Sequence, residues 1–373
     1  WADWSPMTGE QVLELDAYCR ARFIELVPNQ NTFGHLARWM QHPRYQHLCE
    51  YSNPSELNPH QGVFGTLCPT DPGSIELVRE LLDELLPHFA SSQVNVGCDE
   101  ARIGADRTRD IVEERGKGRV YLDYMLKVHE LVQQRGRTMQ FWGDVIMHYP
   151  ELADEMPEGG IPIMYDYAAN APFDDYNAAA AEAGVPFYVS PGTNCWSTII
   201  GNTATAIANI RRAAESAVHY GAIGYLNTDW GDNGHWHHLP VSFAGYAYGA
   251  AMSWAVEANK DIDLPRALDV HCFCDSAGVM GKLVCELGDV SRCHEKLFGT
   301  HGPMPAWILI GLPGMVEQLS GLTGDVLADA DERLKQTMSA LSTARMALPD
   351  AALIADELTN NAGLFSHALH LWS

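Results

Sequence analysis

The amino-acid sequence predicts an α/β fold built on parallel strands, and three features of the chain support this. Short apolar segments alternate with helical patterns as far as residue 255, which is typical of strand–helix–strand units. These segments are apolar throughout, as expected for strands that helices cover on both faces. Acidic, aromatic and amide side chains follow most of them directly. A (β/α)8 TIM-type barrel gathers functional residues at that edge, and the sequence lacks the glycine-rich phosphate loop typical of a doubly wound sheet.

The expected elements follow in a regular order from the N-terminus. A capping box of Thr8 and Gln11 begins the first amphipathic helix, and Ser74 opens the second. Glu151 begins a short helical turn. Three further helices are expected over 119–135, 174–183 and 203–219. The predicted strand segments are 23–27, 93–97, 138–144, 161–167, 185–190 and 222–232.

The number of predicted strands determines the expected domain organisation. A closed barrel of this type has eight strands, and the sequence supplies only six. We therefore expect residues 1–257 to form a barrel that lacks its first one or two strands, with the missing strands upstream of Trp1. From residue 258 to 373 the strand pattern stops. Segments rich in Leu, Ala and Met predict an appended C-terminal α-helical region there.

Composition limits the class of partner. The 373-residue chain contains 48 acidic and 24 basic residues, for a formal net charge of −24. This charge disfavours a nucleic acid, whose phosphates need a basic surface, but is compatible with a neutral ligand such as a sugar. No apolar run reaches the ~20 residues that cross a bilayer, so we expect no membrane partner. Nine cysteines without the density of a disulfide scaffold favour reduced thiols and a cytoplasmic location.

Two adjacent acids mark the end of the strand predicted at 93–97. Asp99 and Glu100 follow it directly, after Cys98. Neighbouring carboxylates repel each other, so this placement at a buried strand end indicates a functional use. The structural alternative is a salt-bridged strand end, or a pair of charges at the N-terminus of a helix.

Four segments with polar or aromatic ends occur in order along the predicted strands: ELVPNQNTFGH (25–35), VNVGCDEA (94–101), MQFWGD (139–144) and NTDWGDNGH (227–235). Together they resemble glycoside hydrolase family 20, the β-N-acetylhexosaminidases, and most closely its hexosaminidase D-like branch. The resemblance covers roughly residues 1–255. Cys98 stands where many relatives carry a second glycine.

The resemblance implies hydrolysis of terminal β-linked N-acetylhexosamine (GlcNAc or GalNAc) by a retaining, substrate-assisted mechanism. Two acids adjacent in sequence cannot flank a sugar ring on opposite faces, as a conventional retaining pair must. In this family the substrate's own 2-acetamido oxygen attacks the anomeric carbon instead. Glu100 would then be the general acid and base, and Asp99 would orient the acetamido group. The expected partner is an N-acetylhexosamine-terminated glycan or glycoside, with no cofactor.

Further candidate residues are expected to bind the sugar. Five aromatic side chains are expected to wall a pocket for the acetamide methyl and the apolar face of the ring: Trp142, Tyr165, Tyr167, Trp196 and Trp230. The resemblance places Asp232 at the ring hydroxyls and His35 beside the catalytic acids, with Asp144 as a neighbour. Alternatives remain for each. The tryptophans suit core packing, His35 suits a structural hydrogen bond, and Asp144 and Asp232 suit helix N-caps.

Other functions stay open at this point. The clusters HWHH (235–238) and HCFC to CH (271–294) contain metal-binding side chains, but neither has zinc-site spacing, so we expect no metal. A conventional barrel glycosidase would need a second carboxylate, such as Asp166 or Asp229, as nucleophile. A carbohydrate-binding protein without turnover would keep the pocket and lose the chemistry.

Overall fold

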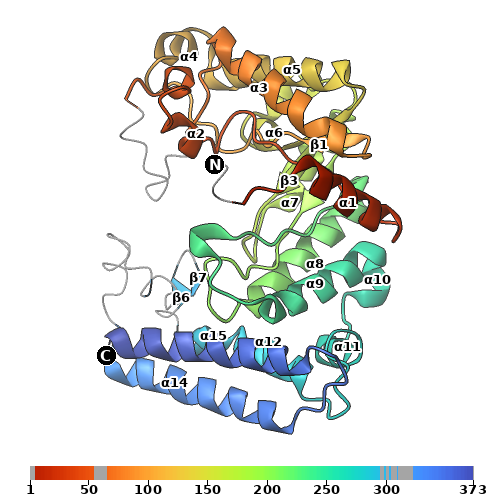
Figure 1. Cartoon of the computed structure of the whole chain (residues 1–373), viewed down its shortest axis with the longest axis vertical. Coiled ribbons are helices and arrows are strands. Elements are labelled where there is room, and N and C mark those ends of the chain that lie inside the picture. The colour runs from red at the N-terminus through yellow and green to blue at the C-terminus, as the bar shows by residue number, and fades with distance from the viewer. Residues whose placement is uncertain are drawn as a thin grey trace. The chain divides into compact units, whose positions relative to one another are not determined.

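The computed structural model (Figure 1) describes residues 5–53, 65–294 and 322–372, together with 298–299, 302–303 and 309. One or two further strands were expected upstream of Trp1, which itself lies outside the described residues. The chain forms two compact units. Unit 1 comprises Trp1–Tyr165 and Asp174–Tyr188, and unit 2 comprises Asp166–Phe173 and Val189–Ser373. The domain division predicted at residue 257 stays a prediction.

Unit 1 contains a parallel sheet of β1 (Gln93–Asn95), β2 (Thr138–Trp142) and β3 (Gly160–Tyr165), in that order. Val94 and Phe141 are fully buried, and most of the other side chains of these strands are buried too. Continuous burial is what their apolar sequence predicts for a sheet that is covered on both faces.

The strand predicted at 23–27 is wrong. Residues 21–23 form a turn, and 24–28 run as coil. Phe23 has a positive φ of 59° and a fully exposed side chain. Parallel pairing begins later, where Asn29 bridges Asn95 and the Asn95 amide donates to the Pro28 carbonyl. The apolar run at 23–27 suggested a buried strand, but its first residues, Phe23 and Ile24, are exposed to solvent.

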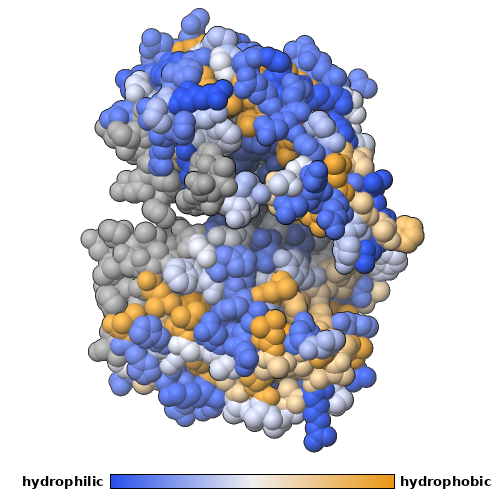
Figure 2. All heavy atoms as spheres, viewed as in Figure 1, coloured by the Kyte–Doolittle hydropathy of each residue, from blue (hydrophilic) through white to orange (hydrophobic). Residues whose placement is uncertain are grey.

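The helices of unit 1 lie near their predicted places. The first, α1 (Gly9–Arg20), has the expected capping box of Thr8 and Gln11. The second, α3 (Pro72–Leu85), begins two residues before Ser74, because Asp71 caps it and Pro72 suits its first position. The others are α2 (Ala37–Met40), η2 (Gln46–Leu48), η5 (Leu86–His88), α4 (Arg109–Arg115), α5 (Lys117–Gln134), α6 (Asp144–His148), η6 (Pro150–Glu155) and α7 (Phe173–Glu182). On the face shown in Figure 2, mostly hydrophilic side chains cover α3 and α5.

Unit 2 continues the strand–helix alternation. β4 (Tyr188–Ser190) is followed by α8 (Thr203–Tyr220) and β5 (Gly224–Tyr225). The two strands are parallel, since the Leu226 amide donates to Val189 and Gly192 bridges Thr228. The α/β prediction is therefore confirmed. The described residues of the two units do not themselves supply the eight strands of a closed barrel.

The rest of unit 2 is mostly helical. Its elements are α9 (Leu239–Trp254), α10 (Val256–Asn259), α11 (Leu264–His271), α12 (Met280–Leu287), η8 (Val290–Cys293), α14 (Gly324–Ser339), η11 (Ala340–Thr343) and α15 (Ala351–Trp372). A short antiparallel pair, β6 (Phe298–Gly299) and β7 (Gly302–Pro303), lies where only helix was expected. Among the residues that the structure describes, every helix is too short or too polar to span a bilayer.

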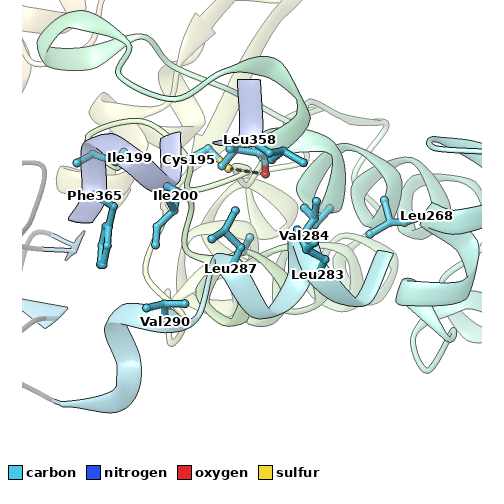
Figure 3. Close-up of a cluster of buried hydrophobic side chains, with 14 of the residues drawn as sticks. Cys195, Ile199, Ile200, Leu268, Leu283, Val284, Leu287, Val290, Leu358 and Phe365 are labelled. Carbon is cyan, nitrogen blue, oxygen red and sulfur yellow. Dashed lines mark hydrogen bonds between the residues drawn. The ribbon is translucent and has the colours of Figure 1, made fainter. Parts of the chain in front are cut away.

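The core of unit 2 joins these helices to a loop that follows β4. Leu358 and Phe365 of α15 are buried in one cluster with Cys195, Ile199 and Ile200 (Figure 3). Burying this apolar surface favours folding, by roughly 25 cal/mol per Å². The C-terminal helices therefore pack against the loop that follows β4.

Candidate active site

A sharp turn follows β1 and carries the two adjacent acids. Gly97, Cys98 and Glu100 have φ values of 68°, 71° and 50°. Only glycine enters this left-handed region without strain, so the surrounding structure must hold Cys98 and Glu100 there. Cys98 is buried with Sγ 3.4 Å from Thr32 Oγ1. Burial raises the pKa of the Cys98 thiol to about 12, so it stays neutral and packs as a small apolar side chain.

His35 lies against both acids. Its Nε2 is 2.9 Å from Asp99 Oδ2 and 3.3 Å from Glu100 Oε2. Burial alone would lower the pKa of His35, but its contacts with Asp99 and Glu100 raise it to about 10. The imidazole is thus a cation at neutral pH and balances one of the two carboxylates. The Asp99 side chain is 18% exposed and that of Glu100 is 46% exposed, so a ligand can reach Glu100.

Asp144 binds the backbone of this turn. It is 5% exposed, and its Oδ2 accepts a hydrogen bond of 2.9 Å from the backbone amide of Glu100. Burial raises the pKa of Asp144 to about 6, although the bond from Glu100 acts in the opposite direction. The N-cap of α6 is Gly143, and Asp144 is its first helical residue. The alternative that Asp144 caps this helix is therefore wrong.

An aromatic pair adjoins Asp144. The rings of Trp142, at the end of β2, and Tyr165, at the end of β3, meet edge to face with centroids 5.3 Å apart. Burial and the neighbouring Asp144 carboxylate raise the pKa of the Tyr165 hydroxyl, so it stays protonated. Trp142 is buried, so core packing explains at least part of its role. Unit 1 thus brings together six of the predicted site residues: His35, Asp99, Glu100, Trp142, Asp144 and Tyr165.

Unit 2 forms a second group from the segments that follow β3, β4 and β5. Trp230 Nε1 donates a hydrogen bond of 2.8 Å to the Tyr167 hydroxyl. The Tyr167 and Trp196 rings meet edge to face, 4.8 Å between centroids. The Trp196 indole lies so close to Gly192 that a Cβ there would be 2.4 Å from it. All three aromatic side chains are half-buried rather than enclosed in the core, which leaves part of each for a ligand.

Asn209 of α8, which the sequence analysis missed, holds two of these aromatic residues in place. It is fully buried, and its Nδ2 donates to the carbonyls of Asp166 and Ala168 at 2.9 Å each. Its Oδ1 accepts from the Gly192 amide at 3.1 Å. One side chain therefore fixes the segment that carries Tyr167 and the loop that leads to Trp196. The sequence feature that could have identified Asn209 is an amide side chain within the apolar face of a helix.

The Asp229 carboxylate accepts several hydrogen bonds from neighbouring side chains. It accepts from the hydroxyls of Thr193 (2.6 Å), Ser242 (2.8 Å) and Tyr246 (2.9 Å), and His237 Nε2 lies 3.7 Å away. Burial raises the pKa of Asp229, but these partners outweigh burial and hold it at about 2. A carboxylate that accepts so many bonds is poorly suited to attack a sugar.

The two remaining acids behave differently. Asp166, the other nucleophile considered, accepts a local hydrogen bond from the Ala168 amide. Asp232 is exposed, two residues after Trp230, and begins a 3-10 turn whose N-cap is Gly231. Its carboxylate does not act as the N-cap that was considered as an alternative.

The catalytic-domain pattern described as glycosyl hydrolase family 20 matches residues 5–205. The chain belongs to this family. The match includes both acids and every unit 1 residue of the site, whereas Trp230 and Asp232 lie beyond it.

Known proteins similar to this family 20 chain agree with that membership. Hexosaminidase D from Homo sapiens is 28% identical over 180 residues, which cover 45% of this chain and 34% of that protein. Hexosaminidase D from Bos taurus is 26% identical over 178 residues, 45% of this chain and 48% of that protein. The chain therefore spans a third to a half of these relatives. The X-ray structure of Flavobacterium johnsoniae chitobiase shares the fold, with a TM-score of 0.53 at 13% identity, over 98% of this chain and 62% of that one.

The histidine and cysteine clusters of the family 20 chain have other contacts. His235 and His237 stack with centroids 4.4 Å apart, and His238 contacts Asn361. The nine cysteines, all within the described ranges, are free thiols. In those ranges no group of three His, Cys, Asp or Glu side chains is arranged to hold a metal ion.

We expect Gly34→Ala to damage the site. A Cβ at Gly34 would lie 2.3 Å from the backbone oxygen of Asp99, so the turn that carries the acids must move. Overpacking of this kind costs about 1–3 kcal/mol of unfolding free energy, and misplacement of the acids should lower turnover at least ~10-fold. The control is Gly363→Ala, because a methyl group there meets open space in the described structure. Equal stability of the two variants would contradict this packing.

We expect the His35 ion pairs to make stability depend on pH. The pKa of His35 is about 10 in the folded chain against 6.5 for the free side chain, so the folded state binds the proton more tightly. Its contribution is complete below pH 6.5 and is lost as the pH rises to about 10. Urea unfolding of wild type and His35→Gln across this range measures it. The difference in unfolding free energy between them should shrink with rising pH, and a constant difference would contradict the ion pairs.

Proposed function

We propose that this family 20 chain releases terminal β-linked N-acetylhexosamine from glycans or glycosides by a retaining, substrate-assisted mechanism. The observation that carries the proposal is the arrangement of Asp99 and Glu100 on one strained turn with His35 against both carboxylates. The relatives named hexosaminidase D support the same activity.

Glu100 is the proposed general acid and base. It is the more exposed of the two acids, and its backbone is fixed by the bond to Asp144. When Glu100 carries a proton, His35 and Asp99 form a neutral ion pair. After Glu100 gives that proton to the leaving oxygen, the cluster has one excess negative charge. That charge arises when the sugar becomes positive, so it stabilises the transition state.

Asp99 is the proposed partner of the 2-acetamido group. Its carboxylate would accept the acetamido N–H, which aims the acetamido oxygen at the anomeric carbon. It would also stabilise positive charge on the ring nitrogen of the oxazolinium-like intermediate. His35 positions this carboxylate from 2.9 Å.

The other predicted residues have binding roles in this proposal. The methyl group of the acetamide packs against Trp142 and Tyr165. Asp144 binds the backbone of the turn that carries Glu100. The half-buried aromatic residues of unit 2, Tyr167, Trp196 and Trp230, bind the apolar face of sugar rings, and the exposed Asp232 binds ring hydroxyls.

The test is turnover of chromogenic aryl N-acetyl-β-glucosaminide and N-acetyl-β-galactosaminide. We expect hydrolysis of at least one of them and much slower hydrolysis of the plain β-glucoside. Preferred hydrolysis of the glucoside would favour the conventional two-carboxylate enzyme, although the hydrogen bonds of Asp229 argue against that residue as its nucleophile. Binding of N-acetylglucosamine without turnover would identify a carbohydrate-binding protein.

A further inference from the structure

A buried asparagine on the C-terminal helix contacts two loops of unit 2. Asn361 of α15 is 0% exposed. Its Nδ2 donates to the carbonyls of Ile199, at 2.6 Å, and Trp236, at 3.0 Å. Its Oδ1 accepts from the His238 amide at 3.1 Å and lies 2.7 Å from His238 Nδ1. The amide therefore uses both its donors and its acceptor on these loops.

These loops carry aromatic residues of the candidate site. The loop at 193–200 contains Trp196, three residues before the Ile199 carbonyl that Asn361 binds. The loop at 228–238 contains Trp230, and Asn361 binds Trp236 and His238 near its end. One side chain thus ties together two segments that follow different strands.

The surroundings of Asn361 are apolar. Leu358 and Phe365, three residues before it and four after it, lie on the same helix face and are buried against Cys195, Ile199 and Ile200 (Figure 3). An amide in such a place costs free energy unless its hydrogen bonds are made, so an apolar residue would serve packing better. The hydrogen bonds of Asn361 to the two loops therefore explain why a polar residue occupies this apolar position.

We propose that Asn361 is a positioning residue that sets the distance between the loop of Trp196 and the loop of Trp230. Its part in sugar binding rests on the function proposed above. Asn361 lies far outside the matched catalytic domain, residues 5–205, so the C-terminal helical segment of the chain contributes through it to the placement of the unit 2 aromatic residues.

The first test measures the loops directly, without substrate. Asn361→Asp keeps the acceptor but turns a carboxylate oxygen toward the Ile199 and Trp236 carbonyls. The matched control is Asn360→Asp, the same change at the exposed neighbour on α15. Hydrogen–deuterium exchange should become at least ~10-fold faster in peptides covering 193–200 and 228–238, and remain unchanged in α5. Unchanged exchange in both loops, or equal changes in the control, would overturn the proposal.

The second test separates positioning from general stability. With an aryl N-acetylglucosaminide, Asn361→Asp should raise KM by about 10-fold and change kcat by less than ~3-fold, because it disturbs binding aromatics and leaves Glu100 in place. Asn361→Ser, which replaces the amide with a single shorter hydroxyl, is the second variant if the first does not fold. If the wild type is active, faster exchange in both loops of Asn361→Asp together with an unchanged KM would overturn the proposal. A wild type without turnover would refute the proposed function, while the exchange test still decides whether Asn361 holds the loops.

Discussion

Replacing Glu100 with Gln should lower kcat by about 10²-fold or more for substrates with a poor leaving group. The substitution keeps the shape of the side chain and removes the proton donor. For aryl glycosides with acidic phenols the loss should be smaller, because such leaving groups depart without protonation. The measurement is kcat for a series of aryl N-acetylglucosaminides whose phenols differ in pKa.

A matched control is Glu113→Gln, at an exposed position on α4 in the same unit. It should leave kcat unchanged across the series. Equal losses in Glu100→Gln for all leaving groups would show that the side chain does not protonate the leaving oxygen, and its role as general acid would have to be abandoned.

Replacing Asp99 with Asn should weaken binding of a thiazoline that mimics the cyclised intermediate, by about 10²-fold. Such a ring, fused across C1 and C2 of the sugar, carries positive charge on nitrogen when protonated. In the proposed mechanism the Asp99 carboxylate attracts that charge, and a neutral amide does not. The inhibition constant of the thiazoline for wild type and Asp99→Asn gives the effect.

The ion pair between Asp99 and His35 complicates this substitution, because Asp99→Asn also removes the partner of the imidazolium. His35→Gln disrupts the same pair and leaves the carboxylate in place. It should therefore weaken thiazoline binding much less than Asp99→Asn does. Equal weakening in the two variants would assign the effect to the ion pair instead of to a direct contact with the intermediate.

The strands were predictable where burial on both faces leaves an unbroken apolar run. Ile163 and Met164 of β3 are both fully buried although they point to opposite faces, and the sequence shows this directly. The segment at 23–27 has the same composition, but Phe23 lies in a solvent-exposed turn. Composition alone does not distinguish the two cases, because pairing there is set by the backbone of Pro28 and Asn29.

The positions of the candidate acids at strand ends were predictable because these acids follow the strands closely in sequence. Asp99 and Glu100 come just after β1, and Asp144 comes just after β2. The residues that hold the loops were not predictable. Asn361 binds His238 across 123 positions of sequence, and Asn209 binds Asp166 across 43. Both act on backbone atoms, whose partners carry no signature in the sequence.

The most direct test of the account compares two aryl β-glycosides that differ only at C2, one with an acetamido group and one with a hydroxyl. If the acetamido oxygen is the nucleophile, the 2-hydroxy substrate lacks the attacking atom and leaves Asp99 without its partner. We expect kcat/KM for the 2-acetamido substrate to exceed that for the 2-hydroxy substrate by at least ~10³-fold. Comparable values, or a sugar trapped covalently on a protein carboxylate, would contradict substrate-assisted catalysis in this protein.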